Sequence, residues 1–330
     1  MKLHSCAVRR WLAVFATACL AGLAACGGGG GGGGSADGPA PLLPLGSGEQ
    51  AYTDPAAYSS AANASLAGAV EAAAVTKHSL LLGGKSIAYT ASAGHLIARD
   101  PASGAAEASM FYVAYTADGA DPATRPVTFL YNGGPGSASV WLHLGSFGPV
   151  RLATGVPATA AATPFALVDN TESLLDTTDL VFVNAVSTGY SQAIAPYTNS
   201  SFWGVDSDAA LFRDFIVRWL AAQQRGASPK FLYGESYGGP RTAVLARLLQ
   251  ASGVRLDGLV LQSPALDYNS NCGVDDSGSC QASLPTYAAI GAWHGLANPA
   301  PPAIDAYMAA LRSFAADRYR SEERRVGKEC

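Results

Sequence analysis

Charged residues are scarce in this sequence. Asp, Glu, Lys and Arg make up 14% of its 330 residues, and 49% are hydrophobic, whereas soluble domains carry about 25% charged residues on average. A chain with this much apolar content is globular rather than disordered, and it is long enough for one large domain. Its formal net charge is −4. A mildly acidic surface does not attract phosphate, so we expect no nucleic-acid partner.

Cysteine and histidine are also few, at six and five residues. No histidine stands at a metal-ligand spacing from Cys272 or Cys280, so we expect no metal site, and no motif indicates a cofactor. Cys272 and Cys280 enclose a short polar loop. In an oxidising compartment these two thiols would close a disulfide that contributes about 2 to 3 kcal/mol to stability.

The N-terminus has the layout of a secretory signal peptide. Three basic residues precede or begin an apolar run at residues 11–25 that is too short to span a bilayer comfortably. The run ends in Leu23-Ala24-Ala25-Cys26, which resembles the lipobox of bacterial lipoproteins, in which the cysteine is acylated. The alternative is an ordinary signal peptide with an incidental cysteine. Gly27 to Gly34 form a flexible tether, so we expect an exported periplasmic or cell-surface lipoprotein that is anchored in a membrane through Cys26.

The composition divides the chain into five segments. We expect a signal peptide at 1–25, a lipidated glycine-rich linker at 26–75 with a short helix near 66–74, a core at 76–268, a cap or insertion segment at 269–319 and a non-native tail at 320–330. The last segment holds seven charges in a chain that otherwise has few. It resembles a tail of adapter origin, and the alternative is a charged helix end.

Apolar residues follow two strand-like patterns within the predicted core. Alternating runs separated by glycine-containing turns predict half-buried antiparallel strands at 86–90, 95–98 and 110–115. Continuous apolar runs predict strands buried on both faces at 127–131, 180–183, 231–233 and 259–261. Helical patterns are expected at 206–224, with Asp206 as the N-cap, at 239–250 and at 303–314. The predicted fold is α/β, with a mostly parallel central sheet and antiparallel N-terminal edge strands.

The sequence Gly234-Glu235-Ser236-Tyr237-Gly238 follows a predicted strand and leads into a predicted helix. This is the pattern and the context of a nucleophile elbow, in which a serine occupies a tight and strained strand-to-helix turn. Larger side chains at the two glycines would collide with neighbouring backbone. Ser236 is therefore the candidate nucleophile.

A second glycine-rich motif, Asn132-Gly133-Gly134-Pro135-Gly136, directly follows the strand predicted at 127–131. In a hydrolase sheet this position supplies one backbone N–H to an oxyanion hole, and the residue after the nucleophile supplies the other. The expected donors are Gly134 and Tyr237. A tight connecting turn is the alternative, and a phosphate-binding loop is excluded because no Gly-Lys-Ser/Thr follows.

Five motifs resemble, in order and approximate spacing, those of the serine carboxypeptidase family. They are Leu130-Tyr131-Asn132-Gly133-Gly134-Pro135-Gly136-Ser137, Gly148-Pro149, Asp179-Leu180-Val181-Phe182-Val183, Thr188-Gly189-Tyr190-Ser191 and Gly234-Glu235-Ser236-Tyr237-Gly238-Gly239. The resemblance implies an α/β-hydrolase that releases C-terminal residues from peptides through an acyl-enzyme on Ser236. It also implies that Asn132 and Glu235 bind the free carboxylate of the substrate, since a protonated glutamate can donate a hydrogen bond to it.

The sequence departs from the family pattern at three positions. Ser146 stands where the family has a second carboxylate, so we expect a higher pH optimum than a site with two paired acids would have. Asn184 and Ser187 replace the Asp and Gly expected before Thr188. These departures leave the substrate preference open.

The acid and base partners of Ser236 are not found in this sequence. This fold orders its triad as Ser, then Asp, then His, and the one histidine after Ser236 is His294, in the predicted cap segment. His143 is expected to be structural or to lie on the substrate side. We therefore expect a C-terminally truncated and inactive fragment of an active enzyme. The alternatives are an esterase or acyltransferase on the same fold, and a non-catalytic, lipid-anchored binding module.

Overall fold

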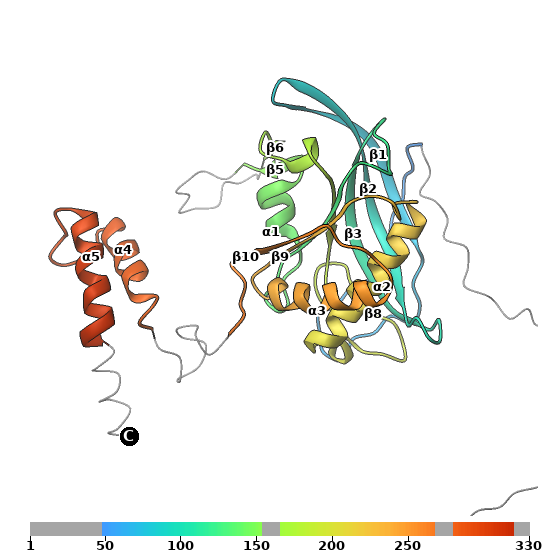
Figure 1. Ribbon diagram of the computed structural model, residues 1–330. Coiled ribbons are helices and arrows are strands. Elements are labelled where there is room, and N and C mark those ends of the chain that lie inside the picture. Colours follow the sequence, from blue (N-terminus) through green and yellow to red (C-terminus); the bar gives the residue numbers. More distant parts are fainter. Residues whose placement is uncertain (1–47, 154–165, 268–279, 320–330) are drawn as a thin grey trace, which may run out of the picture. The chain divides into compact units, whose positions relative to one another are not determined.

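The computed structural model describes residues 48–153, 166–267 and 280–319 (Figure 1). Its main sheet has eight strands. Seven of them follow the order β1-β2-β3-β7-β4-β9-β10, and β8 pairs with β3. Helices lie on both faces of the sheet (Figure 1). The predicted α/β class is confirmed.

The first three strands form an antiparallel meander; antiparallel strands were predicted here, but β1 was not among them. They are β1 (Ala72–Leu82), β2 (Lys85–Arg99) and β3 (Ala106–Ala117). The runs predicted as two strands at 86–90 and 95–98 belong to the single strand β2, so the turn expected at Gly94 is wrong. A Cβ at Gly94 would lie 2.1 Å from the carbonyl oxygen of Ala72, so this glycine allows β1 to approach β2 closely. The helix expected at 66–74 is also wrong, because β1 begins at Ala72.

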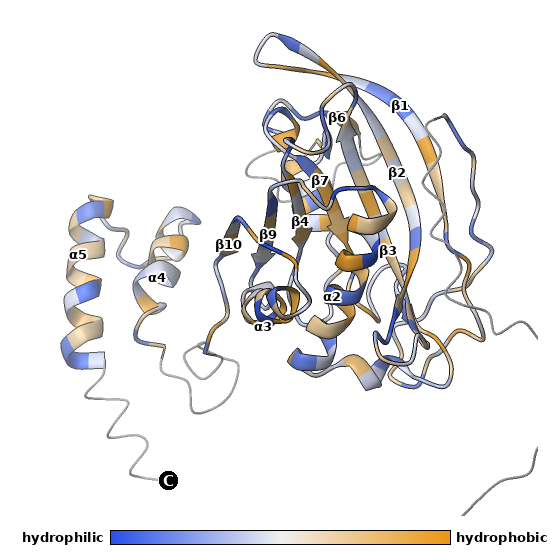
Figure 2. Cartoon of the chain, turned by 45° about the vertical axis from the view of Figure 1, so that its right-hand side comes forward, coloured by the Kyte–Doolittle hydropathy of each residue, from blue (hydrophilic) through white to orange (hydrophobic). Residues whose placement is uncertain are grey.

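The second half of the sheet is parallel. Its strands are β7 (Asp179–Val183), β4 (Val127–Tyr131), β9 (Lys230–Glu235) and β10 (Gly258–Gln262), paired in that order. All residues of β4 and β7 are buried, and both strands are mostly apolar (Figure 2). Strand β10 was predicted to be buried on both faces, but Leu259, Val260 and Leu261 are 41–47% exposed. No strand of the described residues pairs with its outer edge.

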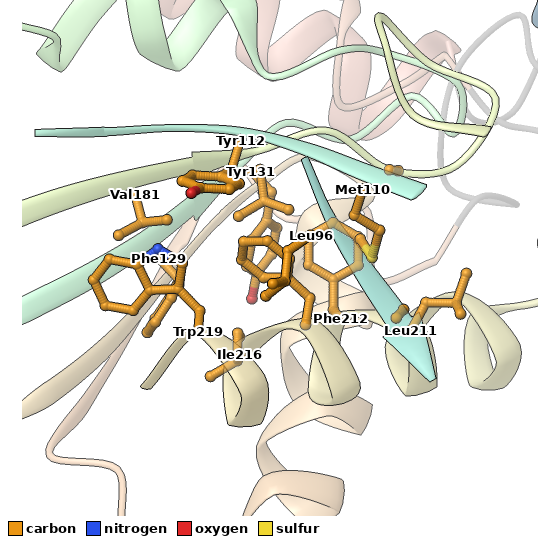
Figure 3. Close-up of a cluster of buried hydrophobic side chains, with 14 of the residues drawn as sticks. Leu96, Met110, Tyr112, Phe129, Tyr131, Val181, Leu211, Phe212, Ile216 and Trp219 are labelled. Carbon is orange, nitrogen blue, oxygen red and sulfur yellow. The ribbon is translucent and has the colours of Figure 1, made fainter. Parts of the chain in front are cut away.

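The larger hydrophobic core lies between the sheet and two long helices, α2 (Val205–Ala222) and α3 (Gly238–Ala251). Phe129 and Tyr131 of β4 point from the sheet toward Phe212 and Trp219 of α2 (Figure 3). Ring centroids lie 5.4 Å apart for Phe129 and Trp219 and 5.0 Å apart for Tyr131 and Phe212. The N-cap of α2 is Gly204 rather than the predicted Asp206, which lies in the first turn.

The opposite face of the sheet is covered by short helical turns. These are α1 (Val140–Leu142), the π-helical turn η1 (His143–Phe147) and the 3-10 turn η2 (Leu174–Asp176). Leu142 and Leu175 pack there with Leu130 and Phe182 of the sheet. The remaining core elements are β5 (Val150–Leu152) paired with β6 (Leu167–Asp169), β8 (Gln192–Ala193) and the 3-10 turn η3 (Asn199–Phe202).

Residues 280–319 form two helices that pack against each other, α4 (Leu284–Trp293) and α5 (Ile304–Phe314), followed by η5 (Ala315–Tyr319). The helical pattern expected at 303–314 is confirmed. Helix α4 was not predicted within the expected cap or insertion segment. Pro285 stands in its first turn, where a proline is tolerated because the N–H that it lacks would have no helical partner.

The part of the predicted linker that the structure describes is packed against the core. We call residues 48–71 the arm. Asn199 Nδ2 donates hydrogen bonds to the carbonyl oxygens of Ser59 (2.8 Å) and Ala61 (2.9 Å). Ser59 N donates to Gln192 Oε1 at 2.7 Å, and Leu66 N donates to the carbonyl oxygen of Ala193 at 2.8 Å. The arm is therefore part of the folded core rather than a free linker.

Several predictions fall on residues outside the described ranges. They concern the signal peptide, acylated Cys26, Cys272 and the tail at 320–330. Cys280, the predicted partner of Cys272, lies within the described ranges and is disulfide-bonded. In the part of the chain that the structure covers, no helix is both long and apolar enough to cross a membrane.

Candidate active site

Ser236 lies between the end of β9 and the start of α3, with a φ of 58°. We call residues 234–238 the elbow. A positive φ is strained for any residue except glycine, and hydrogen bonds hold this one in place. Ser236 N donates to the carbonyl oxygen of Gln262 at 3.0 Å, and Ser236 O accepts from Gly239 N at 2.9 Å and from Ala265 N at 3.0 Å. The side chain is half-buried, and the strained strand-to-helix turn expected at Ser236 is present.

Close contacts require Gly234 of the elbow and Gly239, the residue that follows the elbow. A Cβ at Gly234 would lie 2.2 Å from the carbonyl oxygen of Gly238, and one at Gly239 would lie 2.5 Å from Pro264 Cβ. Atoms at these distances cannot coexist without a shift of their neighbours. At Gly238, the other glycine of the elbow, a Cβ would lie 3.1 Å from the carbonyl oxygen of Tyr131. The tight turn at Ser236 therefore depends on Gly234, as the sequence indicated.

The segment Asn132 to Gly136, which we call the glycine loop, packs directly against the elbow. A Cβ at Gly133 would lie 2.4 Å from Tyr237 N and 2.6 Å from the carbonyl oxygen of Glu235. Gly134 is exposed and has a φ of 109°, a conformation that favours glycine. The structure thus brings the loop of Gly134 and the turn of Tyr237 into contact, although more than a hundred residues separate them in the sequence.

Asn132 and Glu235 are joined at the same junction. Asn132 Nδ2 donates to Glu235 Oε2 at 3.0 Å, and Asn132 Oδ1 accepts from the backbone N–H of Leu142 at 3.0 Å. Asn132 is 2% exposed and Glu235 is half-buried. Because the Leu142 N–H can bond only an oxygen, it fixes which end of the Asn132 amide faces Glu235.

A buried ion pair that the sequence analysis missed supports this junction from α2 and α3. Arg241 Nε donates to Asp208 Oδ2 at 2.7 Å, and Arg241 Nη1 donates to the carbonyl oxygen of Asn132 at 2.8 Å. The Arg241 guanidinium lies 4.5 Å from the ring centroid of Phe212 and 5.1 Å from that of Tyr237. No sequence signal singles out this pair, because the helix predicted at 206–224 also carries Arg213, Asp214 and Arg218.

The structure shows the contacts or the backbone conformation of the three residues that depart from the family pattern. Asn184 Oδ1 accepts from Ser139 N at 2.9 Å, a contact that an aspartate oxygen would also accept. Ser187 has a φ of 64°, so a serine occupies a left-handed conformation where the family pattern has glycine. Ser146 Oγ in η1 donates to the carbonyl oxygen of Trp141 in α1 at 3.0 Å.

The histidines of the core contact groups other than Ser236. His143 Nε2 lies 2.6 Å from Tyr115 Oη, and the His143 ring stacks on Phe182 with centroids 4.6 Å apart. Burial lowers the pKa of His143 to about 4, because desolvation disfavours the charged ring. These contacts agree with a structural role for His143. His294 stands at the C-cap of α4.

We find no group of three or more potential metal ligands in the ranges that the structure covers. Asp257, one of the acids that follow Ser236, has its Oδ2 2.9 Å from Lys230 N, at the start of β9. Because the elbow lies at the other end of β9, this acid has a structural contact far from Ser236.

Comparison with known proteins gives consistent matches. A family model described as "Serine carboxypeptidase" matches residues 85–273. The chain is 29% identical over 180 residues to "Serine carboxypeptidase-like 33" of Arabidopsis thaliana, an alignment that covers 48% of this chain and 34% of the relative. It is 32% identical over 149 residues to "Serine carboxypeptidase-like 44" of the same organism, covering 43% and 28%. The chain therefore spans about a third of the length of these relatives.

One of the similar solved structures is the peroxisomal α/β-hydrolase Lpx1 of Saccharomyces cerevisiae. It is 13% identical to this chain, with a TM-score of 0.32, and the match covers 60% of this chain and 46% of that one. The strand order, the elbow and the helices on both faces, rather than this likeness, confirm the predicted α/β-hydrolase fold.

Proposed function

The chain belongs to the serine carboxypeptidase family, and from this premise we propose that it is the N-terminal part of a serine hydrolase that removes C-terminal residues from peptides. One observation carries the proposal. Ser236 has a φ of 58° on the turn between β9 and α3, and the backbone of the glycine loop packs against that turn. This places a serine beside the loop that supplies an oxyanion hole in this fold.

In the proposed reaction Ser236 Oγ attacks the carbonyl carbon of the last peptide bond. The backbone N–H groups of Gly134 and Tyr237 stabilise the negative charge that develops on the carbonyl oxygen. The N-terminus of α3 adds a favourable dipole. The C-terminal amino acid leaves with a proton, and water then hydrolyses the acyl-enzyme on Ser236 to release the shortened peptide.

Ser236 needs a general base to take its proton. The fold orders its triad as Ser, Asp, His. We therefore propose that the complete protein carries an aspartate and a histidine in a further region, which corresponds to the part of the relatives that this chain does not span. The chain alone is then expected to retain only weak catalysis from the oxyanion hole. The complete protein is the one to assay.

Asn132 and Glu235 are proposed to bind the free carboxylate of the substrate. Their hydrogen bond places an amide and a carboxyl group side by side at the elbow. A protonated glutamate donates a hydrogen bond to a carboxylate, whereas an ionised one repels it. The pair would thereby select peptides with a free C-terminus.

We further propose that the protein is exported and held at a membrane by an acylated Cys26, with Cys272 and Cys280 paired in the oxidising compartment. The support is the sequence pattern at residues 1–34 and the short polar loop between the two cysteines. Metabolic labelling with a radioactive fatty acid tests the anchor. Loss of label in Cys26→Ser is the expected result, and an equally labelled variant would contradict it.

The catalytic proposal is tested with a fluorophosphonate probe on the full-length protein. We expect labelling of the wild type and of Ser146→Ala, and no labelling of Ser236→Ala. Cleavage of a peptide with a free C-terminal carboxylate, but not of its amide, indicates a carboxypeptidase. Cleavage of small esters alone indicates the esterase or acyltransferase alternative, and an unlabelled wild type indicates a binding module.

A further inference from the structure

His95 of β2 lies where the arm meets the sheet, and it is 5% exposed. The ring of Tyr58 in the arm stacks on the His95 ring, with centroids 5.2 Å apart and planes 4° from parallel. His95 Nε2 lies 2.9 Å from the carbonyl oxygen of Tyr190, in the segment that we call the 187–191 loop. Phe111 of β3 completes the surroundings, with its ring centroid 5.3 Å from that of His95. His95 therefore joins the arm to the 187–191 loop.

The contacts of His95 indicate a neutral ring. A carbonyl oxygen can only accept a hydrogen bond, so Nε2 carries the hydrogen. Nδ1 is buried and makes no hydrogen bond, although Asp54 Oδ2 lies 3.3 Å away. A proton on Nδ1 would thus place a positive charge in a buried position without a hydrogen-bond acceptor. Burial lowers the pKa of His95, and the opposing effects of the Tyr190 carbonyl and the Asp54 charge are smaller.

Other ionisable groups around His95 come from the arm, the 187–191 loop, β1 and α2. They are Tyr52, Asp54, Tyr58, Tyr190, Glu71 and Arg218. Glu71, which precedes the residue of β1 paired with His95, is itself bound to Arg218 of α2. Burial raises the pKa of Asp54, but hydrogen bonds from Tyr58 and Ala56 lower it further, so it lies below its ordinary value. His95 is therefore the group of this set whose charge changes in mild acid.

Undocking of the arm would change the surroundings of His95. The stacked ring of Tyr58 and the carboxylate of Asp54 would leave together, and water would reach the His95 ring. A solvated imidazole titrates near 6.5, above the pKa of the ring when the arm is docked. The undocked state then binds the proton more readily, so docking weakens as the pH falls through about 6.5 and stops weakening below the docked pKa. Uptake of one proton changes the docking equilibrium by at most about tenfold per pH unit.

Both segments that His95 joins line a cavity of about 360 Å³ beside the elbow. Ser60 of the arm and Ser187 of the 187–191 loop contribute to its lining, as does Tyr237 of the elbow. Ser187 Oγ also accepts a hydrogen bond of 3.0 Å from Nε1 of Trp203, another lining residue. Undocking of the arm removes Ser60 from this lining. The protonation of His95 can thereby control how open the surroundings of the elbow are.

We propose that His95 is a pH-sensitive latch: its neutral ring holds the arm against the sheet, and proton uptake at Nδ1 releases the arm and opens the cavity beside the elbow. The hydrogen bonds of the arm to Asn199 and Gln192 involve side-chain amides, which do not titrate. The latch concerns a conformational equilibrium of the chain, so it does not depend on the proposed peptidase activity.

Hydrogen exchange of the full-length protein, followed by mass spectrometry between about pH 7.5 and about pH 5, tests the latch. Ser59 N and Leu66 N are hydrogen-bonded to the core, so their exchange, corrected for the intrinsic rate at each pH, reports release of the arm. In the wild type this corrected exchange should become faster below about pH 6.5, by at most about tenfold per pH unit. Amides of β4 report global unfolding and should stay protected over the same range.

Two variants and a matched control identify the titrating group. His95→Gln cannot titrate and keeps an N–H donor for the Tyr190 carbonyl, so its corrected arm exchange should not change with pH. Asp54→Asn removes a charge that raises the pKa of His95, so the acceleration should extend to lower pH than in the wild type. His78→Gln makes the same substitution at an exposed position of β1 and should keep the wild-type profile. Circular dichroism establishes that each variant is folded.

The possible outcomes decide the proposal. Arm exchange that does not change with pH in the wild type, an unchanged acceleration in His95→Gln, or arm and β4 amides that accelerate together would each overturn the latch. If His95→Gln does not fold, Asp54→Asn decides, and a profile identical to that of the wild type overturns it. No substrate is used, so the expected profiles in a protein that cleaves no peptide would support the latch and contradict the proposed function.

Discussion

Asn132 Nδ2 lies 3.0 Å from Glu235 Oε2 and donates a hydrogen bond to it. The first residue of the glycine loop is thereby joined to the residue just before the proposed nucleophile. Leu142 N holds the other end of the amide. Any displacement of the glycine loop would therefore shift the elbow as well. A carboxylate-binding pair at this position keeps a fixed distance to Ser236.

We expect Asn132→Ala to raise KM for a peptide with a free C-terminal carboxylate by about tenfold, because it removes a donor worth about 1 to 3 kcal/mol when buried. KM for the corresponding methyl ester should change much less. Steady-state kinetics of the full-length protein on the acid and ester pair measure this difference. Equal changes in KM for the two substrates would show that Asn132 only supports the loop.

Breaking the ion pair between Asp208 and Arg241 should destabilise the protein strongly. Asp208→Asn leaves the Arg241 guanidinium buried without its counter-charge, and we expect a loss of about 3 to 5 kcal/mol in the free energy of unfolding. Urea denaturation measures it. The control is Arg255→Ala, because Arg255 is 87% exposed in its pair with Asp257 and such pairs contribute about 0 to 1 kcal/mol. Similar losses in the two variants would contradict the assignment.

Ser187 offers a test of backbone strain. Its φ is 64°, which costs a residue with a Cβ about 1 to 2 kcal/mol relative to glycine. Ser187→Gly and Ser187→Ala both lose the hydrogen bond from Trp203, so the difference between them isolates the strain. We expect Ser187→Gly to be the more stable of the two by about 1 to 2 kcal/mol in urea denaturation. A difference near zero would mean that the backbone around residue 187 relaxes when alanine is present.

The buried His143 predicts a loss of stability in mild acid. Its folded-state pKa is lowered to about 4, whereas the unfolded chain titrates near 6.5. As the pH falls from about 6.5 to about 4, the unfolded state binds a proton that the folded state rejects, and up to about 3 kcal/mol of stability is lost. His143→Phe should therefore flatten the free energy of unfolding over this window, measured by urea denaturation at several pH values. Parallel curves for the two proteins would exclude His143 as the cause.

The sequence predicted the features of this fold that have a local signal. The elbow around Ser236 and the apolar strands β4 and β7 are examples, because backbone sterics and burial on both faces leave a mark within a few residues. Helix α4 escaped prediction because prolines and glycines around it resemble turn residues. Gly94 was interpreted as a turn, although its role is to admit the neighbouring strand β1.

Features that depend on tertiary packing were not predictable in this way. Asp208 and Arg241 are 33 residues apart, and nothing in either helix indicates that they form a pair below the glycine loop. The arm has a linker-like composition, yet its backbone forms hydrogen bonds with the side chains of Asn199 and Gln192. Both contacts exist only because the sheet brings distant segments together.

The docking of the arm has a practical consequence for anyone who trims the protein to its recognisable family region. A recombinant fragment that starts at Lys85 would discard strand β1 and the arm together. It would leave the polar side chains of Asn199 and Gln192 without the backbone groups that now satisfy them. A starting point before Gln50, whose backbone pairs with Val75, preserves that outer layer.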